Sequence, residues 1–212
     1  MVPFEVQAGG SCPHVGEFML ALAAEFHSVD LVAASDHLDA LGEAVRPIAA
    51  CGALVQAGAC LEVLHNREGF RAREDTDPEA LMLDRLLERG EGHPLALAAL
   101  YVEVARRGGL ELLPLSSGST VVVGHPGADP PVFVDPVRGT LLPRDAVPRG
   151  AGWRCPHGLG FLVLGELIDA FLLRGEVVRA MHGARLRLSL PLADDLRECM
   201  DHAVRGLHAR FN

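Results

Sequence analysis

One segment constrains the fold of this chain more than any other: residues 84–110, with the sequence DRLLERGEGHPLALAALYVEVARRGGL. A turn at Arg89–Gly92 leads into Pro94, and the apolar periodicity then predicts a helix over Leu95–Arg107 that ends at Gly108. Apolar residues nearly encircle this helix, which is typical of a helix buried on all sides. We therefore expect the rest of the chain to fold around it.

The start of this helix is where a cysteine enzyme would carry its nucleophile, because the N-terminus of a helix stabilises a thiolate. Pro94 stands there instead. All 19 basic residues are arginines, so lysine Schiff-base chemistry is excluded as well. Any fixed positive charge in a site must therefore come from arginine.

The composition indicates a globular protein: 212 residues, 49% of them hydrophobic, can bury a sizeable core. A net charge of −9 argues against nucleic acid and anionic membrane surfaces as partners. The first ten residues lack the features of a signal peptide, and the longest apolar stretch, Leu159–Leu173, is short for a membrane span. Five cysteines, an odd number, are typical of reduced thiols. We expect a soluble cytoplasmic protein.

Apolar residues recur every three or four positions in the first half, which predicts helices there. They are expected at Val15–Phe26, Val29–Val45, Ile48–Leu64 and Pro78–Glu88, the last capped by Asp77. After Leu110 the pattern changes to short β-type runs between turns. Strands are expected at Glu111–Leu115, Thr120–Val123 and Pro131–Asp135, and tail helices at Leu159–Leu173, Val177–Leu188 and Asp194–Ala209.

The predicted fold class is α+β. It combines a helical N-terminal lobe, a central helix on a short antiparallel sheet, and a C-terminal helical hairpin. The Pro/Gly-rich piece around residues 143–158 is the best candidate boundary. The expected domains are therefore residues 1–152 and 153–212.

Residues 87–110 resemble the SirB-type transglutaminase-like core family, in which a Gly-x-Pro turn opens a helix ending Tyr-x-Glu-Val-Ala-Arg-Arg-x-Gly-Leu. The turn is Gly92–Pro94 in this chain. The turn at Asn66–Phe70 and the segment Val134–Pro136 are also similar, and residues 164–194 resemble the tetratricopeptide-like hairpin that often follows. The resemblance implies a transglutaminase-like core over most of the chain.

Active transglutaminase-like enzymes use a Cys at the helix start, a His on the next strand and an Asp on the strand after it. By resemblance these places fall on Pro94, Ser119 and Asp135. Proline at the first place is usual in this subfamily, whereas the loss of the imidazole sets this chain apart. Only the carboxylate remains, which argues against thiol acyl transfer.

Asp135 is a candidate general base or amine-binding carboxylate, or else it caps the turn Pro136–Gly139. His93, just before the helix, is a candidate acid, base or anion ligand, or else an exposed loop histidine. Arg138 could bind an anionic substrate group, or else form a surface ion pair with Asp135.

Four hydroxyls lie where the family presents its imidazole and could bind a carboxylate, sulfate or phosphate, or else form a plain turn: Ser116, Ser117, Ser119 and Thr120. Tyr101 is a candidate substrate-binding residue on the buried helix. Glu103 is a candidate catalytic carboxylate there, or else a structural charge paired with Arg106 or Arg107.

The tripeptide Cys-Pro-His occurs twice, at residues 12–14 and 155–157. Together the copies offer two thiols and two imidazoles, the ligand set of a tetrahedral zinc site. Their spacing is shorter than that of zinc-finger pairs, and nothing in the sequence brings them together, so no metal and no cofactor is expected. Cys51, Cys60 and Cys199 are expected in the core.

Two functional classes remain open. The first is a cysteine-independent tailoring enzyme of specialised metabolism. It would use a carboxylate base with hydroxyl and arginine anion binders for intramolecular substitution, elimination or group transfer on a small molecule carrying an amine and an acidic group. The second is a catalytically silent binding or regulatory subunit. A protein partner or a homo-oligomer fits either class.

Overall fold

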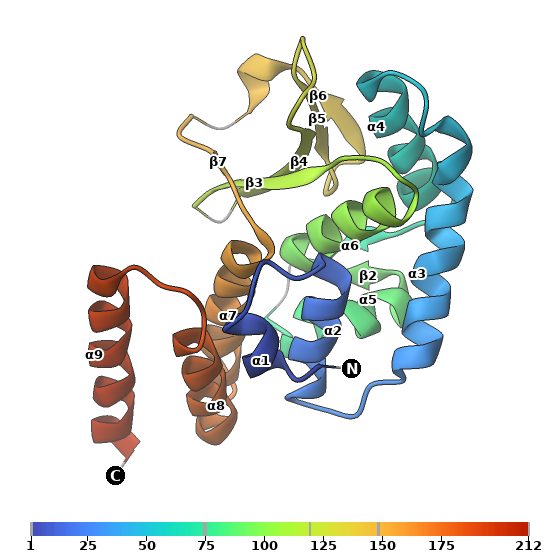
Figure 1. Cartoon of the computed structure of the whole chain (residues 1–212). Coiled ribbons are helices and arrows are strands. Elements are labelled where there is room, and N and C mark those ends of the chain that lie inside the picture. Colours follow the sequence, from blue (N-terminus) through green and yellow to red (C-terminus); the bar gives the residue numbers. More distant parts are fainter. Residues whose placement is uncertain (1, 74–75, 119, 148, 212) are drawn as a thin grey trace.

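The structure is a computed structural model that describes residues 2–73, 76–118, 120–147 and 149–211, and side chains as far as Gly206 (Figure 1). Helix α6 (Pro94–Arg107) lies at its centre. Every residue from Leu95 to Ala105 is buried. Helices α2, α3 and α5 and the β-sheet all pack against α6 (Figure 1). The predicted buried central helix is therefore confirmed.

The helices before α6 form the N-terminal lobe and cover the sides of α6 that the sheet leaves open (Figure 1). Gly108, at the end of α6, allows the closest approach: a Cβ built there would lie 2.4 Å from Cγ2 of Val45. The lobe consists of α1 (Phe4–Ala8), α2 (Val15–Ala24), α3 (Leu31–Val45), α4 (Ala53–Leu61) and α5 (Leu83–Arg89).

Two predicted helices are interrupted in the structure. A helix was expected over Ile48–Leu64. In the structure a 3₁₀ turn, η1 (Arg46–Ile48), comes first, and α4 begins only after the extended Gly52. The π-helix η2 (Glu62–Arg67) then continues α4. The helix expected over Pro78–Glu88 is a 3₁₀ turn, η3 (Pro78–Leu81), followed by α5.

The break between η3 and α5 occurs because Met82 is extended, with φ −91° and ψ 127°. Periodicity does not reveal such a break, since the apolar positions on both sides keep the helical spacing. Asp77 caps the first turn as predicted, with its carboxylate accepting from the Glu79 backbone N–H at 3.2 Å.

A five-stranded antiparallel sheet, in the order β6-β5-β4-β3-β7, covers one side of α6 (Figure 1). The three predicted strands form the centre of the sheet. The two short strands at its edges were not predicted from the sequence. The strands are β3 (Leu113–Ser117), β4 (Thr120–His125), β5 (Val132–Asp135), β6 (Thr140–Leu142) and β7 (Gly152–Trp153). The fold is α+β, as predicted from the sequence.

A second, two-stranded pairing lies at the start of α6. Strand β1 (Arg71–Ala72) runs parallel to β2 (Glu91–Gly92), with Arg71 opposite Glu91. The pairing joins the segment after η2 to the turn before α6. It therefore fixes where α6 begins relative to the N-terminal lobe.

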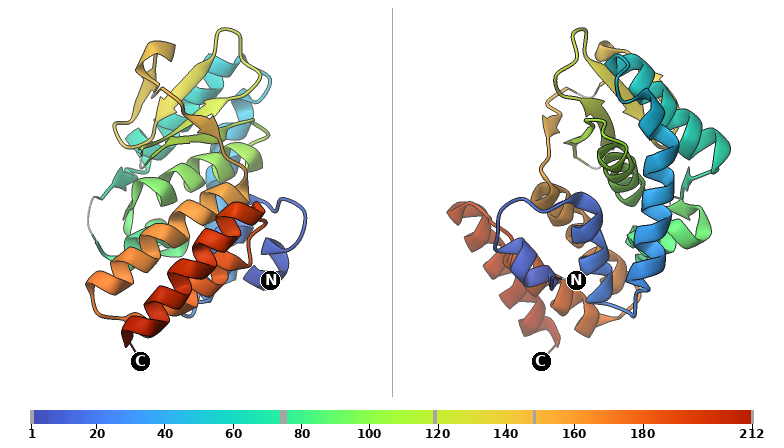
Figure 2. Two further views of the ribbon diagram at one scale, coloured as in Figure 1. Left: turned by 90° about the vertical axis from the view of Figure 1, so that its left-hand side faces the viewer. Right: turned by 45° about the vertical axis from the view of Figure 1, so that its right-hand side comes forward.

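The chain ends in three helices that lie side by side (Figure 2): α7 (Pro156–Leu173), α8 (Val177–Leu188) and α9 (Asp194–Phe211). Helix α7 also packs on α6 and α2. The predicted division into residues 1–152 and 153–212 stays a prediction.

Helix α7 begins at Pro156, not at Leu159 as expected, and is 18 residues long with a mean hydropathy of 1.4. By length and composition alone it could cross a membrane. Core helices of water-soluble proteins have the same properties, and 44% of α7 is buried inside the fold. The helix is therefore weak support for a membrane span.

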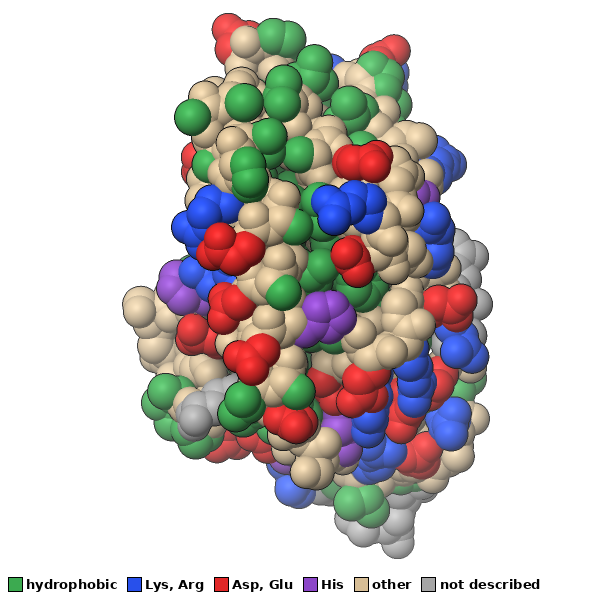
Figure 3. Space-filling view, turned by 90° about the vertical axis from the view of Figure 1, so that its right-hand side faces the viewer, with side chains coloured by type: hydrophobic (Ala, Val, Ile, Leu, Met, Phe, Trp, Pro, Cys, Tyr) green, Lys and Arg blue, Asp and Glu red, His purple; other side chains and the backbone are tan. Residues whose placement is uncertain are grey.

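Hydrophobic side chains gather at one end of the molecular face shown in Figure 3, whereas acidic and arginine side chains alternate over the rest of it. Leu54 and Val55 of α4 and Leu141 of β6 are exposed hydrophobic residues. All three line a groove of about 560 Å³ between α4 and the β5–β6 edge of the sheet.

Candidate functional site

The turn before α6 holds His93 at the position that caps the helix. Its Nδ1 accepts a hydrogen bond from the Leu95 backbone N–H at 3.2 Å, and its own backbone N–H donates to Ala80 O at 2.7 Å. The side chain is half-buried, so His93 is not the exposed loop histidine considered from sequence. Its role as acid, base or anion ligand stays a prediction.

The hydroxyl residues lie on the β3–β4 hairpin, where Ser117 pairs with Thr120. Ser116 is buried and its Oγ accepts from Nε of Arg154 at 2.7 Å, while Oγ of Ser117 donates to Arg149 O at 3.3 Å. Thr120 is exposed.

Ser119 lies outside the described residues. For the predicted anion-binding role, the structure therefore describes only the hydroxyls of Ser116, Ser117 and Thr120. Of these, Thr120 is exposed, Ser117 is half-buried and Ser116 is buried.

Asp135 ends strand β5 and is 9% exposed. Its Oδ1 accepts from the backbone N–H groups of Val137 at 2.9 Å and Arg138 at 3.1 Å. The guanidinium of Arg138 is 76% exposed and lies 3.8 Å from Oδ2. The carboxylate therefore caps the turn, as one sequence interpretation held, and Oδ2 is the oxygen left for other chemistry.

A histidine that the sequence did not single out lies over this turn. The ring of His65, in the π-helix η2, occupies the space next to Gly139: a Cβ built there would lie 2.2 Å from Nε2 of His65. Nδ1 of His65 is buried and has no hydrogen-bond partner among the described residues. π-Helical turns are frequent at functional sites, but a π-helix has no clear sequence signature.

Tyr101, on α6, is fully buried. Its hydroxyl has no hydrogen-bond partner among the described residues. Burial raises the pKa of this phenol well above its ordinary value; the nearby Cys60 and Asp135 raise it further, and Arg71 lowers it. Tyr101 therefore lies within electrostatic range of both Asp135 and Arg71.

Arg71, the first residue of β1, lies within electrostatic range of both His65 and Tyr101. Its guanidinium donates to the backbone carbonyls of His65 and Phe70. Burial lowers the pKa of His65, and the positive charge of Arg71 lowers it further, so the imidazole is held neutral. We refer to His65, Arg71, Tyr101 and Asp135 as the Asp135 cluster.

Glu103 lies on another part of α6, ten residues or about 15 Å along the helix from His93. The side chain is fully buried. Its oxygens accept from Arg106 at 2.6 and 3.0 Å, from Arg107 at 2.8 Å and from the Gly16 backbone N–H at 3.1 Å. These contacts are those of the structural charge considered from sequence, and a catalytic role stays a prediction.

Burial alone would raise the pKa of Glu103, but the hydrogen bonds from Arg106 and Arg107 lower it by more, so the carboxylate is ionised. Arg107 also binds Asp39 of α3 at 2.6 Å. The charges of Glu103 and its arginines thus join α6 to α2 and α3.

The thiol of Cys60, which lies near Tyr101, is inert. Cys60 of α4 is fully buried, and burial raises its pKa to about 12, so almost none is thiolate at neutral pH. Cys51 and Cys199 were expected in the core but are exposed, because Cys51 lies in the turn before α4 and Cys199 on the outer helix α9. Pro94 occupies the helix start, so no described thiol can serve as nucleophile there.

A search of curated proteins finds no match, and a search of solved structures finds none either. The model of the transglutaminase-like superfamily matches residues 32–149, which is more than half of the chain. The matched residues run from α3 to the segment before β7 and include α6, the hairpin and Asp135. The chain therefore belongs to the transglutaminase-like superfamily.

Proposed function

We propose that this chain is a cysteine-independent enzyme that acts on a small molecule at the Asp135 cluster. The observation that carries the proposal is a pair of buried polar atoms without a hydrogen-bond partner in the described part of the chain, Nδ1 of His65 and the hydroxyl of Tyr101. An unsatisfied buried polar atom costs about 1–3 kcal/mol, and a native fold retains few of them. His65 lies over the turn that Asp135 caps, and Tyr101 lies within electrostatic range of the Asp135 carboxylate, which is a reason to expect a bound ligand there.

The cluster contains the groups that acid–base chemistry requires. The carboxylate of Asp135 can accept a proton from an amine or bind an ammonium group, and the neutral His65 can transfer a proton. Arg71 and Arg138 can bind an acidic substrate group. Intramolecular substitution, elimination or group transfer within specialised metabolism fits this set, and His93 and the hydroxyls of Ser117 and Thr120 would bind further polar groups.

Within the superfamily we place the chain in the SirB-type subgroup, because Gly92–Pro94 and the end of α6 match the pattern of that subgroup. We also propose a cytoplasmic location and a heteromeric or homo-oligomeric assembly. The exposed hydrophobic residues Leu173 and Val178, where α7 meets α8, support a protein contact there.

A catalytically silent binding or regulatory subunit is the second candidate. It is supported by the hydrogen bonds that already occupy Oδ1 of Asp135 and Oγ of Ser116. In that case the helical hairpin would be the docking surface. A groove of about 450 Å³ between α7, α8 and α9 lies in this region.

The test compares Asp135→Asn with Asp145→Asn. Asn keeps the oxygen that caps the turn but not the charge, so the fold is expected to survive. Asp145 is exposed and serves as the matched control. Each protein would be combined with the products of the neighbouring genes, and substrate consumption and product formation followed by mass spectrometry.

We expect Asp135→Asn to abolish conversion and Asp145→Asn to preserve it. Full conversion by both variants would overturn the enzyme and favour the binding subunit. Size-exclusion mass with co-expressed neighbours tests the proposed assembly.

A further inference from the structure

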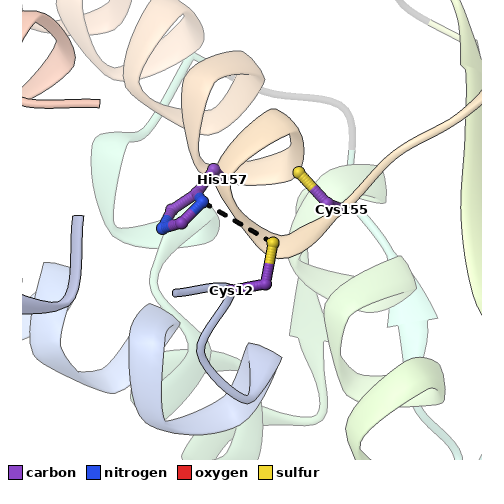
Figure 4. A group of neighbouring side chains, drawn as sticks. All are labelled: Cys12, Cys155 and His157. Atoms are coloured by element: carbon purple, nitrogen blue, oxygen red, sulfur yellow. Dashed lines mark hydrogen bonds between the residues drawn. The ribbon is translucent and has the colours of Figure 1, made fainter. Parts of the chain in front are cut away.

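The two Cys-Pro-His copies, 143 residues apart in sequence, meet in space. Cys12 lies in the loop between α1 and α2, Cys155 is the residue before α7, and His157 lies in the first turn of α7. Sγ of Cys12, Sγ of Cys155 and a ring nitrogen of His157 lie within 4.8 Å of one another (Figure 4). His14 is exposed and belongs to no such group among the described residues.

The imidazole of His157 is oriented as a metal ligand would be. Its Nε2 lies 3.2 Å from the backbone carbonyl of Gln7, which can only accept, so Nε2 carries the proton. Nδ1 is therefore the nitrogen with a free lone pair, and it faces Sγ of Cys12 at 3.7 Å (Figure 4). Metal-bound histidines usually donate their second N–H to a carbonyl or carboxylate in this way.

The spacing of the three atoms fits a tetrahedral ion. Zn–S bonds of about 2.3 Å and Zn–N bonds of about 2.0–2.1 Å place neighbouring ligand atoms roughly 3.6–3.8 Å apart. The pair Cys12 Sγ and His157 Nδ1 already has this separation. The three separations, all within 4.8 Å, would have to shorten by at most ~1.2 Å, and Cys12 lies on an exposed loop.

The surroundings of the three residues also favour a metal. His157 is 6% exposed and its ring packs edge-on against Phe18 at 5.5 Å between centroids, so its orientation is fixed before an ion arrives. Two thiolates would neutralise a divalent ion, so the loaded site carries no net charge. Thiolate and imidazole together select zinc over the hard ions magnesium and calcium.

We propose that Cys12, Cys155 and His157 bind one zinc ion and thereby fasten the N-terminal segment to the start of α7. All three residues lie outside residues 32–149, so the match to the superfamily says nothing about this site. Cys155 and His157 also line a groove of about 330 Å³, together with residues of α7 and of the connection between α8 and α9. Water or a donor group of a molecule bound in this groove would complete the tetrahedron.

The full chain, freed of metal under reducing conditions, would be titrated with Zn²⁺ against a chromophoric chelator and separately with Co²⁺. We expect one ion per chain, with the thiolate-to-cobalt absorption and the visible bands of a tetrahedral Co²⁺ site. Zinc should also raise the melting temperature, because it binds the folded state preferentially.

Matched variants assign the ligands. Cys12→Ser and His157→Gln should each weaken zinc binding at least ~100-fold, beyond the 10–100-fold effect of changes outside the ligand set. Cys51→Ser and His14→Gln should keep the affinity of the unaltered chain, since Cys51 and His14 are exposed residues outside the group.

The proposal fails if the unaltered chain binds less than one ion, or if Cys12→Ser keeps its affinity. It also fails if the control variants lose affinity equally, or if Cys12 and Cys155 form a disulfide that persists in the reducing, zinc-saturated solution. The titration uses no enzyme assay, so its outcome is independent of the function proposed for the Asp135 cluster.

Discussion

The imidazole of His65 fills the space in which Gly139 lacks a side chain, so the π-helix after α4 packs directly on the turn that Asp135 caps. These segments are distant in the sequence. The contact places an imidazole next to the end of β5, whereas the position that the family resemblance assigns to an imidazole holds Ser119. It makes the turn, the π-helix and the carboxylate one structural unit.

Gly139→Ala should destabilise the fold strongly. Gly139 has φ of +63°, where alanine costs about 1–2 kcal/mol, and the added methyl also collides with His65. Gly175→Ala is the control: its φ is +73°, but no atom of the described residues lies within 4 Å of the added Cβ. Urea unfolding should show a larger loss for Gly139→Ala. Equal losses would mean that the His65 contact is absent in solution.

Tyr101→Phe separates function from stability. The hydroxyl is buried and has no hydrogen-bond partner among the residues that the structure describes. Its removal should therefore leave the free energy of unfolding unchanged or raise it by up to about 1–3 kcal/mol, the cost of an unsatisfied polar group. If the hydroxyl binds substrate, conversion falls nonetheless. Thermal melts and the mass-spectrometric assay measure the two effects. A marked loss of stability would show that the hydroxyl has a structural partner.

His65 should contribute a pH dependence to stability. Its pKa is lowered in the fold by burial and then by Arg71, so the unfolded chain binds the proton more tightly. The contribution of neutral His65 to the free energy of unfolding is therefore complete above its unfolded pKa of about 6.5. This contribution is lost as the pH falls through the lower pKa of the folded state. His65→Gln should flatten the dependence of unfolding free energy on pH below about 6.5. An unchanged slope contradicts this assignment.

Glu103 should contribute a pH dependence to stability at lower pH than His65 does. Its folded pKa lies below its ordinary value, so its stabilisation is complete above about pH 4.3 and is lost as the pH falls through the folded pKa. Glu103→Gln should cost about 3–5 kcal/mol at neutral pH, because it breaks a buried ion pair. Glu43→Gln, in an exposed pair with Arg46, should cost less than about 1 kcal/mol. Similar losses in both would contradict the structural role of Glu103.

Cys60 should resist alkylation in the native protein, because it is buried and its pKa is raised to about 12. Peptide mapping after iodoacetamide treatment should find Cys51 and Cys199 modified and Cys60 unmodified until urea is added. Rapid native modification of Cys60 would indicate that α4 opens readily.

The sequence predicted the elements whose signals are local. The apolar residues around α6, the alternation in β3–β5 and the Asp77 cap are each visible within a few residues, because helix and strand periodicity depend on neighbouring positions. The interruption at Met82 and the edge strand β7 were missed. Both depend on what the segment packs against, and their own residues carry no distinct signal.

What the sequence determined by itself is the α+β class, the buried helix α6 and the absence of a thiol at its start, because patterns within single segments decide these. Only the tertiary structure decided that His65 packs on the Asp135 turn and that Cys12 meets Cys155 and His157. Such contacts join residues far apart along the chain, and their geometry depends on how whole helices and strands pack. No local pattern contains that information.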